Sequence, residues 1–129
     1  MIEVDLAIVG AGLAGCALTH CLGRNGFDGK TLLIEAGRGP GGRASSRRHR
    51  DDSIWRIDHG APVLNFSAAP EGSVAGLLHP LFDQGVLVKE RRPVVLVDDQ
   101  GEQLASLPQG VSYAGAPTMA SVSEALLQQ

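Results

Sequence analysis

Three glycines near the N-terminus are spaced for binding a phosphate group. Gly10, Gly12 and Gly15 follow an apolar run that ends at Val9, and a segment with helical periodicity begins at Leu13. A glycine turn between a strand and a helix lets the backbone approach an anion, which then meets the positive end of the helix dipole. Gly10 permits the tight turn, Gly12 leaves room for a pyrophosphate, and Gly15 allows close packing of helix and strand. The residues of this turn that we expect to contact the ligand are Gly10, Ala11, Gly12, Leu13, Ala14 and Gly15.

A carboxylate follows this turn at an informative distance. Glu35 lies twenty residues after Gly15 and ends a second apolar segment that begins at Thr31. In a βαβ unit, an acid at this spacing accepts hydrogen bonds from ribose hydroxyls. A lone GxGxxG pattern is weak evidence, but the strand, helix and acid around this one make it strong. The sequence therefore predicts a dinucleotide-binding βαβ unit, without separating FAD from NAD.

A second glycine-rich motif follows Glu35. Residues 38–46 read Arg-Gly-Pro-Gly-Gly-Arg-Ala-Ser-Ser, which resembles the second phosphate-binding motif of the flavin amine oxidase superfamily, including renalase-like and phytoene-desaturase-like enzymes. Paired glycines leave backbone N–H groups open beside an anion, and Arg43 adds a fixed charge with fork-shaped donors. Residues 57–61 resemble the family's Asp-x-Gly-Ala segment, which passes close to the flavin ring. Three motifs in the right order favour a flavoprotein.

The resemblance implies FAD as the cofactor and adds binding residues to those of the first turn. These are Glu35, Ala36, Arg38, Gly41, Gly42, Arg43, Gly60, Ala61 and Pro62. Short bacterial renalase-like proteins look closest, although Pro62 and Val63 stand where that family usually has Gln and an aromatic residue. Residues 113–119 resemble a family stretch before a helix, with Thr118 in place of the usual glycine. The implied activity is hydride transfer from a reduced nicotinamide or an amine to flavin, and then to oxygen.

Other readings remain open. The chain could be a non-catalytic or vestigial dinucleotide-binding module that cannot hold flavin because its sheet is incomplete. An NAD-binding Rossmann protein is disfavoured, because residues 41–43 have no counterpart in that fingerprint. NADP is less favoured still, since Glu35 would repel the additional phosphate, although Arg38 could partly offset this repulsion.

No catalytic residue can be assigned. The flavin-adjacent lysine of amine oxidases would come from a C-terminal half that this chain does not contain. His59 lies near the flavin by its motif position, but local hydrogen bonding is the favoured role for it. The spacings of metal sites and nucleophile elbows are absent. Cys16 and Cys21 lie on different sides of the expected first helix, which predicts buried small side chains rather than a disulfide.

Charge is distributed unevenly. The net charge is −3, yet five arginines fall within residues 38–50, which contain no acid. Without interleaved aromatic residues or a nucleic-acid motif, a nucleic-acid partner is disfavoured. The cluster is interpreted first as a solvated loop. As a hypothesis, Arg47, Arg48 and Arg50 could attract a phosphorylated or anionic small-molecule substrate.

The expected fold class is α/β. Residues 1–66 would form a Rossmann-like βαβ FAD-binding fold with an incomplete parallel sheet and the Gly-Gly-Arg loop. Residues 67–129 would begin a smaller mixed α+β substrate domain. Strands are expected at 3–9, 31–35, 54–57, 86–89, 94–97 and 103–107, and helices at 13–24, at 71–84 with a kink or end at Pro80, and from about 118.

The last helix predicts a buried face of Met119, Val122, Ala125 and Leu126, and it reaches Gln129 without a stop signal. We therefore expect an N-terminal portion of a longer enzyme, or a degenerate short homologue. With 43% hydrophobic and 19% charged residues, no leader peptide and no membrane-length apolar run, a cytoplasmic protein is expected. Oligomeric state is not predicted.

Overall fold

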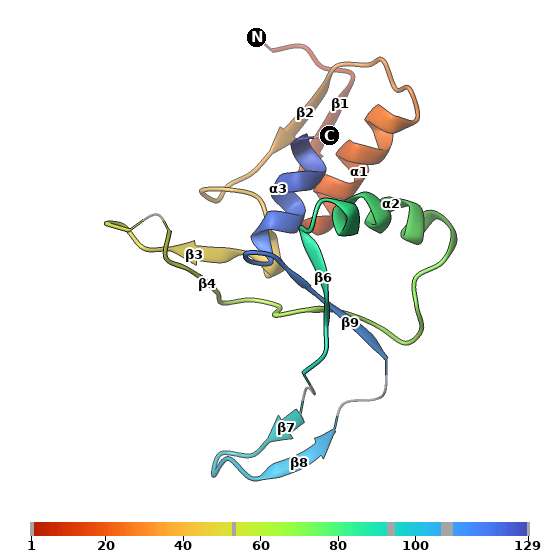
Figure 1. The fold of residues 1–129 in the computed structure, drawn as a ribbon. Coiled ribbons are helices and arrows are strands. Elements are labelled where there is room, and N and C mark those ends of the chain that lie inside the picture. Colours follow the sequence, from red (N-terminus) through yellow and green to blue (C-terminus); the bar gives the residue numbers. More distant parts are fainter. Residues whose placement is uncertain (1, 53, 93–94, 107–109, 129) are drawn as a thin grey trace.

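The computed structural model describes residues 2–52, 54–92, 95–106 and 110–128, which form an α/β fold with a Rossmann-like βαβ unit at its N-terminus (Figure 1). Small antiparallel sheets and two further helices follow this unit. In chain order the elements are β1 (Leu6–Val9), α1 (Leu13–Arg24), β2 (Thr31–Ile34), a short 3-10 helix (Gly42–Ala44), β3 (Ser46–Arg48), β4 (Arg56–Asp58), β5 (Leu64–Phe66), α2 (Gly72–Asp83), β6 (Leu87–Glu90), β7 (Val95–Val97), β8 (Gln103–Ser106), β9 (Val111–Gly115) and α3 (Ala120–Gln128).

The βαβ unit matches the prediction closely. β1 and β2 pair in parallel from Leu6↔Thr31 to Val9↔Ile34, and they form a two-stranded sheet. α1 has the predicted bounds and ends at Asn25, whose N–H donates to the carbonyl of Cys21. The expected incomplete parallel sheet is therefore confirmed. This two-stranded sheet leaves apolar surface exposed: Val9, at the end of β1, is 83% accessible to solvent.

A three-stranded antiparallel sheet was not predicted in full. β9 lies in the centre, with β5 on one side and β6 on the other. β6 corresponds to the predicted strand at 86–89, whereas β5 and β9 were missed as strands. Their segments are short and carry no clear alternation of polar and apolar residues. The packing of Tyr113 from β9 against Phe66 and Phe82 is long-range, and a local pattern cannot reveal it.

One apolar core joins the three helices to this sheet. α3 packs beside α1, and α2 lies next to β6 (Figure 1). The buried residues of the core are Ala11, Cys16, Leu78, Leu81, Leu87, Tyr113, Val122, Ala125 and Leu126. The predicted buried face of the last helix is confirmed, including Met119. Because core residues come from both sides of residue 66, the division into 1–66 and 67–129 stays a prediction.

Two local details differ from what the sequence led us to expect. Pro80 does not end α2, which continues to Asp83. Pro80 lies in the last turn, where its missing N–H removes one helical bond while its carbonyl still accepts from the N–H of Gln84. The segment between the expected strands at 31–35 and 54–57, where no strand was predicted, is also not a loop throughout. It contains β3, which pairs antiparallel with β4 from Ser46↔Asp58 to Arg48↔Arg56.

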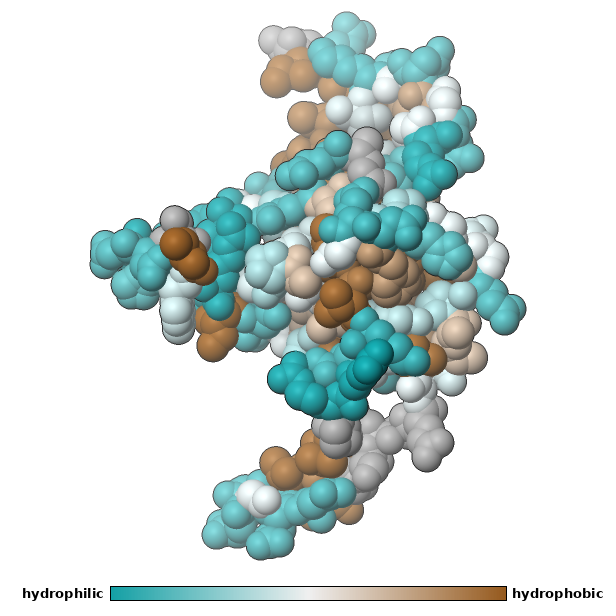
Figure 2. All heavy atoms as spheres, in the orientation of Figure 1, coloured by the Kyte–Doolittle hydropathy of each residue, from teal (hydrophilic) through white to brown (hydrophobic). Residues whose placement is uncertain are grey.

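The β7–β8 hairpin projects away from the rest of the molecule (Figure 1). Asp98 closes its turn, because one carboxylate oxygen accepts from the N–H groups of Gln100 and Glu102. Apolar side chains, including Leu96 and Leu104, remain exposed on it (Figure 2). The ends of the two predicted strands at 94 and 107 fall outside the described residues. Each helix in the described part of the chain is too short or too polar to cross a bilayer.

Candidate dinucleotide-binding site

The two glycine-rich loops lie against each other. The N–H of Gly41 donates to the carbonyl of Ala11 at 2.8 Å, and Gly12 pairs with Gly41 as an isolated parallel bridge. The fit is close, since a Cβ added to Gly42 would lie 3.1 Å from the Cα of Gly12. Gly42 also has a φ of 55°, which favours glycine. The first turn and the Gly-Gly-Arg loop are therefore in direct contact.

Gly15 allows α1 to pack closely against the first turn. A Cβ at this position would overlap the carbonyl oxygen of Gly10, so α1 could not approach the end of β1 as it does. The N–H of Gly10 in turn donates to the carbonyl of Ile34 at 2.7 Å. The turn is thereby held to both strands of the parallel sheet. α1 begins directly after it, and the first N–H groups of a helix have no acceptor inside the helix.

Glu35 connects the two loops through its carboxylate. Oε2 accepts from the N–H of Ala11 at 2.7 Å, and Oε1 accepts from the N–H of Gly37 at 2.6 Å. These bonds, first that of Gly37 and then that of Ala11, lower the pKa of Glu35 below its ordinary value, with a smaller contribution from Ala36. The exposed carboxylate is therefore ionised at neutral pH. We call residues 10–15, Glu35 and residues 37–42 the glycine cradle.

The third motif packs against the second. The N–H of Ala61 donates to the carbonyl of Arg43 at 2.7 Å, and a Cβ at Gly60 would overlap that same carbonyl oxygen. The neighbouring His59 places Nε2 3.3 Å from Oγ of Ser45. Pro62 follows as an exposed residue. The structure thus brings together all three motifs that the sequence suggested, although they are spread over residues 10–62.

Two motif residues hold α3 in place. Oδ1 of Asp58 accepts from Oγ of Ser46 at 2.6 Å and from the N–H of Met119 at 3.0 Å. Oγ of Ser46 accepts in turn from the N–H of Ala120 at 3.1 Å. These bonds satisfy N–H groups at the start of α3, as a helix cap does. The serine of the Gly-Gly-Arg motif and the aspartate of the Asp-x-Gly-Ala motif therefore position the C-terminal helix.

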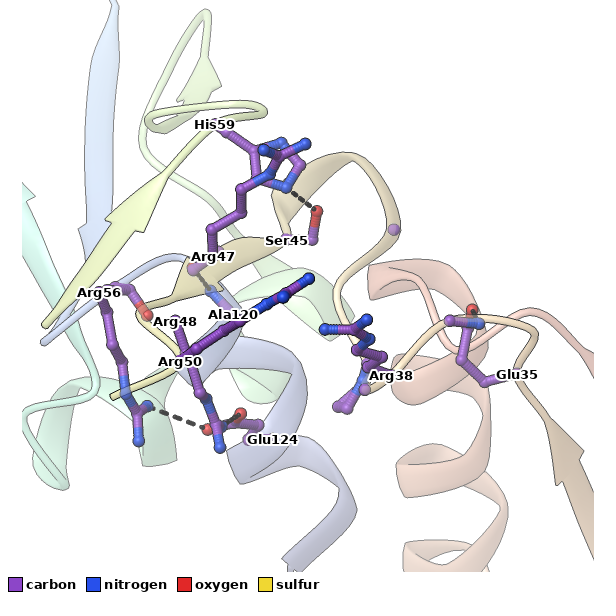
Figure 3. Close-up of a pocket in the computed structure, with 16 residues that line it drawn as sticks. Glu35, Arg38, Ser45, Arg47, Arg48, Arg50, Arg56, His59, Ala120 and Glu124 are labelled. Carbon is purple, nitrogen blue, oxygen red and sulfur yellow. Dashed lines mark hydrogen bonds and ion pairs between the residues drawn. The ribbon is translucent and has the colours of Figure 1, made fainter. Parts of the chain in front are cut away.

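A cavity of about 970 Å³ opens beside these loops (Figure 3). Among the predicted site residues, Glu35, Arg38 and Gly42 line it. None of the first-turn residues 10–15 lines it, and neither do Ala36, Gly41, Arg43, Gly60, Ala61 and Pro62. The lining is Glu35, Gly37, Arg38, Gly39, Pro40, Gly42, Ser45, Ser46, Arg47, Arg48, Arg50, Arg56, His59, Thr118, Ala120 and Glu124. Five arginines and two glutamates give it an excess of positive charge.

Sequence reasoning missed part of this lining. Glu124 of α3 forms an ion pair with Arg48 at 2.6 Å and lies 3.9 Å from a guanidinium nitrogen of Arg56. Arg48 and Arg56 stand opposite each other in the β3–β4 hairpin, where their charges would otherwise repel. The arginine cluster gave a signal in the sequence. Glu124 gave none, since only the fold brings α3 to the hairpin. No cluster of His, Cys, Asp and Glu that could hold a metal occurs among the described residues.

Residues 8–80 match the model of a family described as NAD(P)-binding Rossmann-like domain. Because this match covers more than half of the chain, the chain belongs to that family. No curated protein matches it. The fold is shared with a solved structure, the CLA-producing fatty acid isomerase from P. acnes, at 23% identity and a TM-score of 0.51, covering 81% of this chain and 23% of that one.

A second similar structure is putrescine oxidase bound to putrescine. It is 22% identical, with a TM-score of 0.48, and the match covers 84% of this chain and 22% of that one. The chain therefore spans less than a quarter of the length of both solved chains. At 23% identity the likeness to the isomerase concerns the fold alone.

Proposed function

We propose that the chain supplies the ADP-binding part of a renalase-like, FAD-dependent oxidoreductase. The observation that supports this most is the hydrogen-bonded contact between the two glycine loops, made by Gly41 and Ala11 and joined by Glu35. Two such loops and an ionised acid offer complementary partners for a pyrophosphate and a ribose. The complete enzyme would oxidise a reduced nicotinamide or an amine and pass the electrons to oxygen.

The residues present fit the ADP moiety of FAD. Each oxygen of Glu35 accepts one strong backbone bond and keeps lone pairs for ribose hydroxyls. The first N–H groups of α1 and the backbone of Gly42 suit the pyrophosphate, beside the fixed charge of Arg43. Side chains at Gly42 or Gly15 would fill or displace this cradle. Donor chemistry and space therefore agree with the proposed group.

When bound, FAD would supply the hydride-accepting isoalloxazine. The chain's own residues would bind and orient it. Glu35 would fix the ribose, Arg43 would neutralise phosphate charge, and the segment of Gly60 and Ala61, held by the Arg43 carbonyl, would lie along the cofactor. The division at residue 66, a small-molecule substrate and a cytoplasmic location belong to the same proposal.

A second candidate is a module that binds NAD(P) without flavin chemistry. The description of the matched family favours it, and an ADP moiety is common to both cofactors. The Gly-Gly-Arg loop argues for flavin, because it lies in contact with the first turn and is not part of the NAD fingerprint.

Flavin fluorescence titrations test the proposal. The purified chain should bind FAD weakly, because the sheet behind the cradle has two strands only. ADP should displace FAD, and FMN, which lacks the adenosine half, should not bind. Gly42→Ala should weaken FAD binding, whereas Gly76→Ala in α2, which lies outside the cradle and whose added Cβ meets nothing within 4 Å, should not. Binding of FMN as tight as that of FAD would contradict the proposal, and equal affinities for FAD and NADH would favour the second candidate.

A further inference from the structure

One end of the cavity has a composition that the ADP proposal does not use. Glu35 and Arg38 lie on the side of the cavity near α1 (Figure 3). On the other side, Arg48 and Arg56 extend toward Glu124. Arg50 lies between these two sides, and Arg47 lies near His59. We call this other side the arginine end and define it by Arg47, Arg48, Arg50, Arg56, Thr118 and Glu124.

The ion pairs at the arginine end do not neutralise all of its positive charge. Arg48 and Arg56 share the single carboxylate of Glu124. Arg47 and Arg50 form no ion pair with any residue in the described part of the chain, although both line the cavity. The arginine end thus holds four guanidinium groups and one carboxylate. Guanidinium forks bind phosphate oxygens through pairs of charge-assisted hydrogen bonds.

A buried hydroxyl provides an independent indication. Thr118 lines the same cavity and is only 4% exposed, yet its Oγ1 has no hydrogen-bond partner within residues 2–52, 54–92, 95–106 and 110–128. A buried hydroxyl without a partner is costly, so a ligand that bonds to it would gain stability.

The N-terminus of α3 would not bind an anion at the arginine end. Its first N–H groups already donate to Asp58 and Ser46. An anion at the arginine end would therefore be held by side chains rather than by a helix terminus. This separates it from the glycine cradle, where backbone groups face the ligand.

We propose that the arginine end is a second anion subsite, which takes a phosphate group of a ligand distinct from the ADP moiety. Arg47 and Arg50 bind its oxygens and Thr118 donates to it. Glu124 is an internal competitor, because its carboxylate occupies Arg48 and Arg56 until a ligand replaces it. The inference rests on the proposed function only in assigning ADP to the other end of the cavity. It implies that the substrate class is phosphorylated.

The test is calorimetric titration with inorganic pyrophosphate at fixed ionic strength, on the full chain alone and on the chain saturated with ADP. We expect pyrophosphate still to bind the ADP-saturated chain, because the arginine end is separate from the glycine cradle that ADP occupies, and the variants are compared in that ADP-saturated state. The double variant R47Q/R50Q should weaken pyrophosphate binding about tenfold, since charge-assisted hydrogen bonds are lost. Glu124→Gln should tighten it about threefold, within the range of an exposed ion pair.

Matched controls change the same charges elsewhere. Arg91→Gln and Glu3→Gln lie outside the cavity and should leave the affinity unchanged. Thr118→Val should weaken pyrophosphate binding without altering the affinity for ADP. Circular dichroism of each variant verifies folding, and the Arg Nε–Hε signals in NMR report the ligand at Arg47 and Arg50 even if one variant is unstable.

The outcomes separate this inference from the proposed function. Pyrophosphate binding that depends on Arg47 and Arg50 in a chain that does not bind ADP would support the subsite and refute the ADP assignment. Complete competition between ADP and pyrophosphate, with no effect of R47Q/R50Q or Glu124→Gln, would overturn the second subsite. An unchanged affinity in Glu124→Gln alone would refute the role of Glu124 as competitor.

Discussion

Part of the glycine cradle, namely Glu35, residues 37–40 and Gly42, lines the same cavity as the arginine end, but the two regions are built in different ways. The cradle is held by backbone groups and one acid, through bonds such as those of Ala11 and Gly37 to Glu35. The arginine end depends on side chains far apart in sequence, as in the ion pair of Arg48 with Glu124. A site formed by backbone groups can be recognised in the sequence by its glycines, because it requires positions without a side chain. Side-chain sites become visible only when the fold is known.

The largest expected effect concerns the glycine requirement of the cradle. Gly15→Ala places a Cβ onto the carbonyl oxygen of Gly10 and should lower the free energy of unfolding by about 2–3 kcal/mol. Gly23→Ala in the same helix is the matched control. Its added Cβ meets nothing within 4 Å, so it should raise stability by about 1 kcal/mol through helix propensity. Urea unfolding measures both, and equal effects of the two substitutions would refute the packing role of Gly15.

The next effect concerns how α3 is held at the arginine end. Asp58→Ala removes the acceptor of the Met119 N–H and of the Ser46 hydroxyl. We expect a loss of about 1–2 kcal/mol in the free energy of unfolding, as for other helix caps. Asp51→Ala, at an exposed position near the same hairpin, should change stability little. A loss in Asp58→Ala no greater than in Asp51→Ala would show that side-chain capping does not hold α3.

The smallest effect is a pH dependence at the cradle. The N–H groups of Gly37 and Ala11 hold the pKa of Glu35 below its ordinary value. A lowered pKa means that this carboxylate stabilises the fold above its unfolded pKa and loses that contribution as pH falls through its folded pKa. The stability difference between the native chain and Glu35→Gln should therefore shrink on acidification. Urea unfolding of both chains, from neutral pH to pH values below the folded pKa of Glu35, tests this. A stability difference that stays constant with pH would show that the backbone bonds to Glu35 do not stabilise the fold.

The sequence allowed the βαβ unit to be predicted almost residue by residue, because local periodicity and glycine spacing encode it. α1 and the buried face of α3 followed from apolar residues at helical spacing. β9 did not, since its pairing with β5 and β6 depends on partners far away in the chain. The same limit applies to the site. Glu35 has a fixed distance from the first turn, whereas Thr118 and Glu124 reach the cavity only through tertiary packing.

The most direct test of the account is a ¹H–¹⁵N NMR titration of the chain with ADP. If the two glycine loops and Glu35 form one cradle, the amide signals of residues 10–15, 37–39, 41 and 42 should shift together and saturate with a single affinity. Those shifts should be lost in Glu35→Gln and retained in R47Q/R50Q. Shifts confined to one loop, or to the arginine end, would contradict a shared ADP-binding cradle.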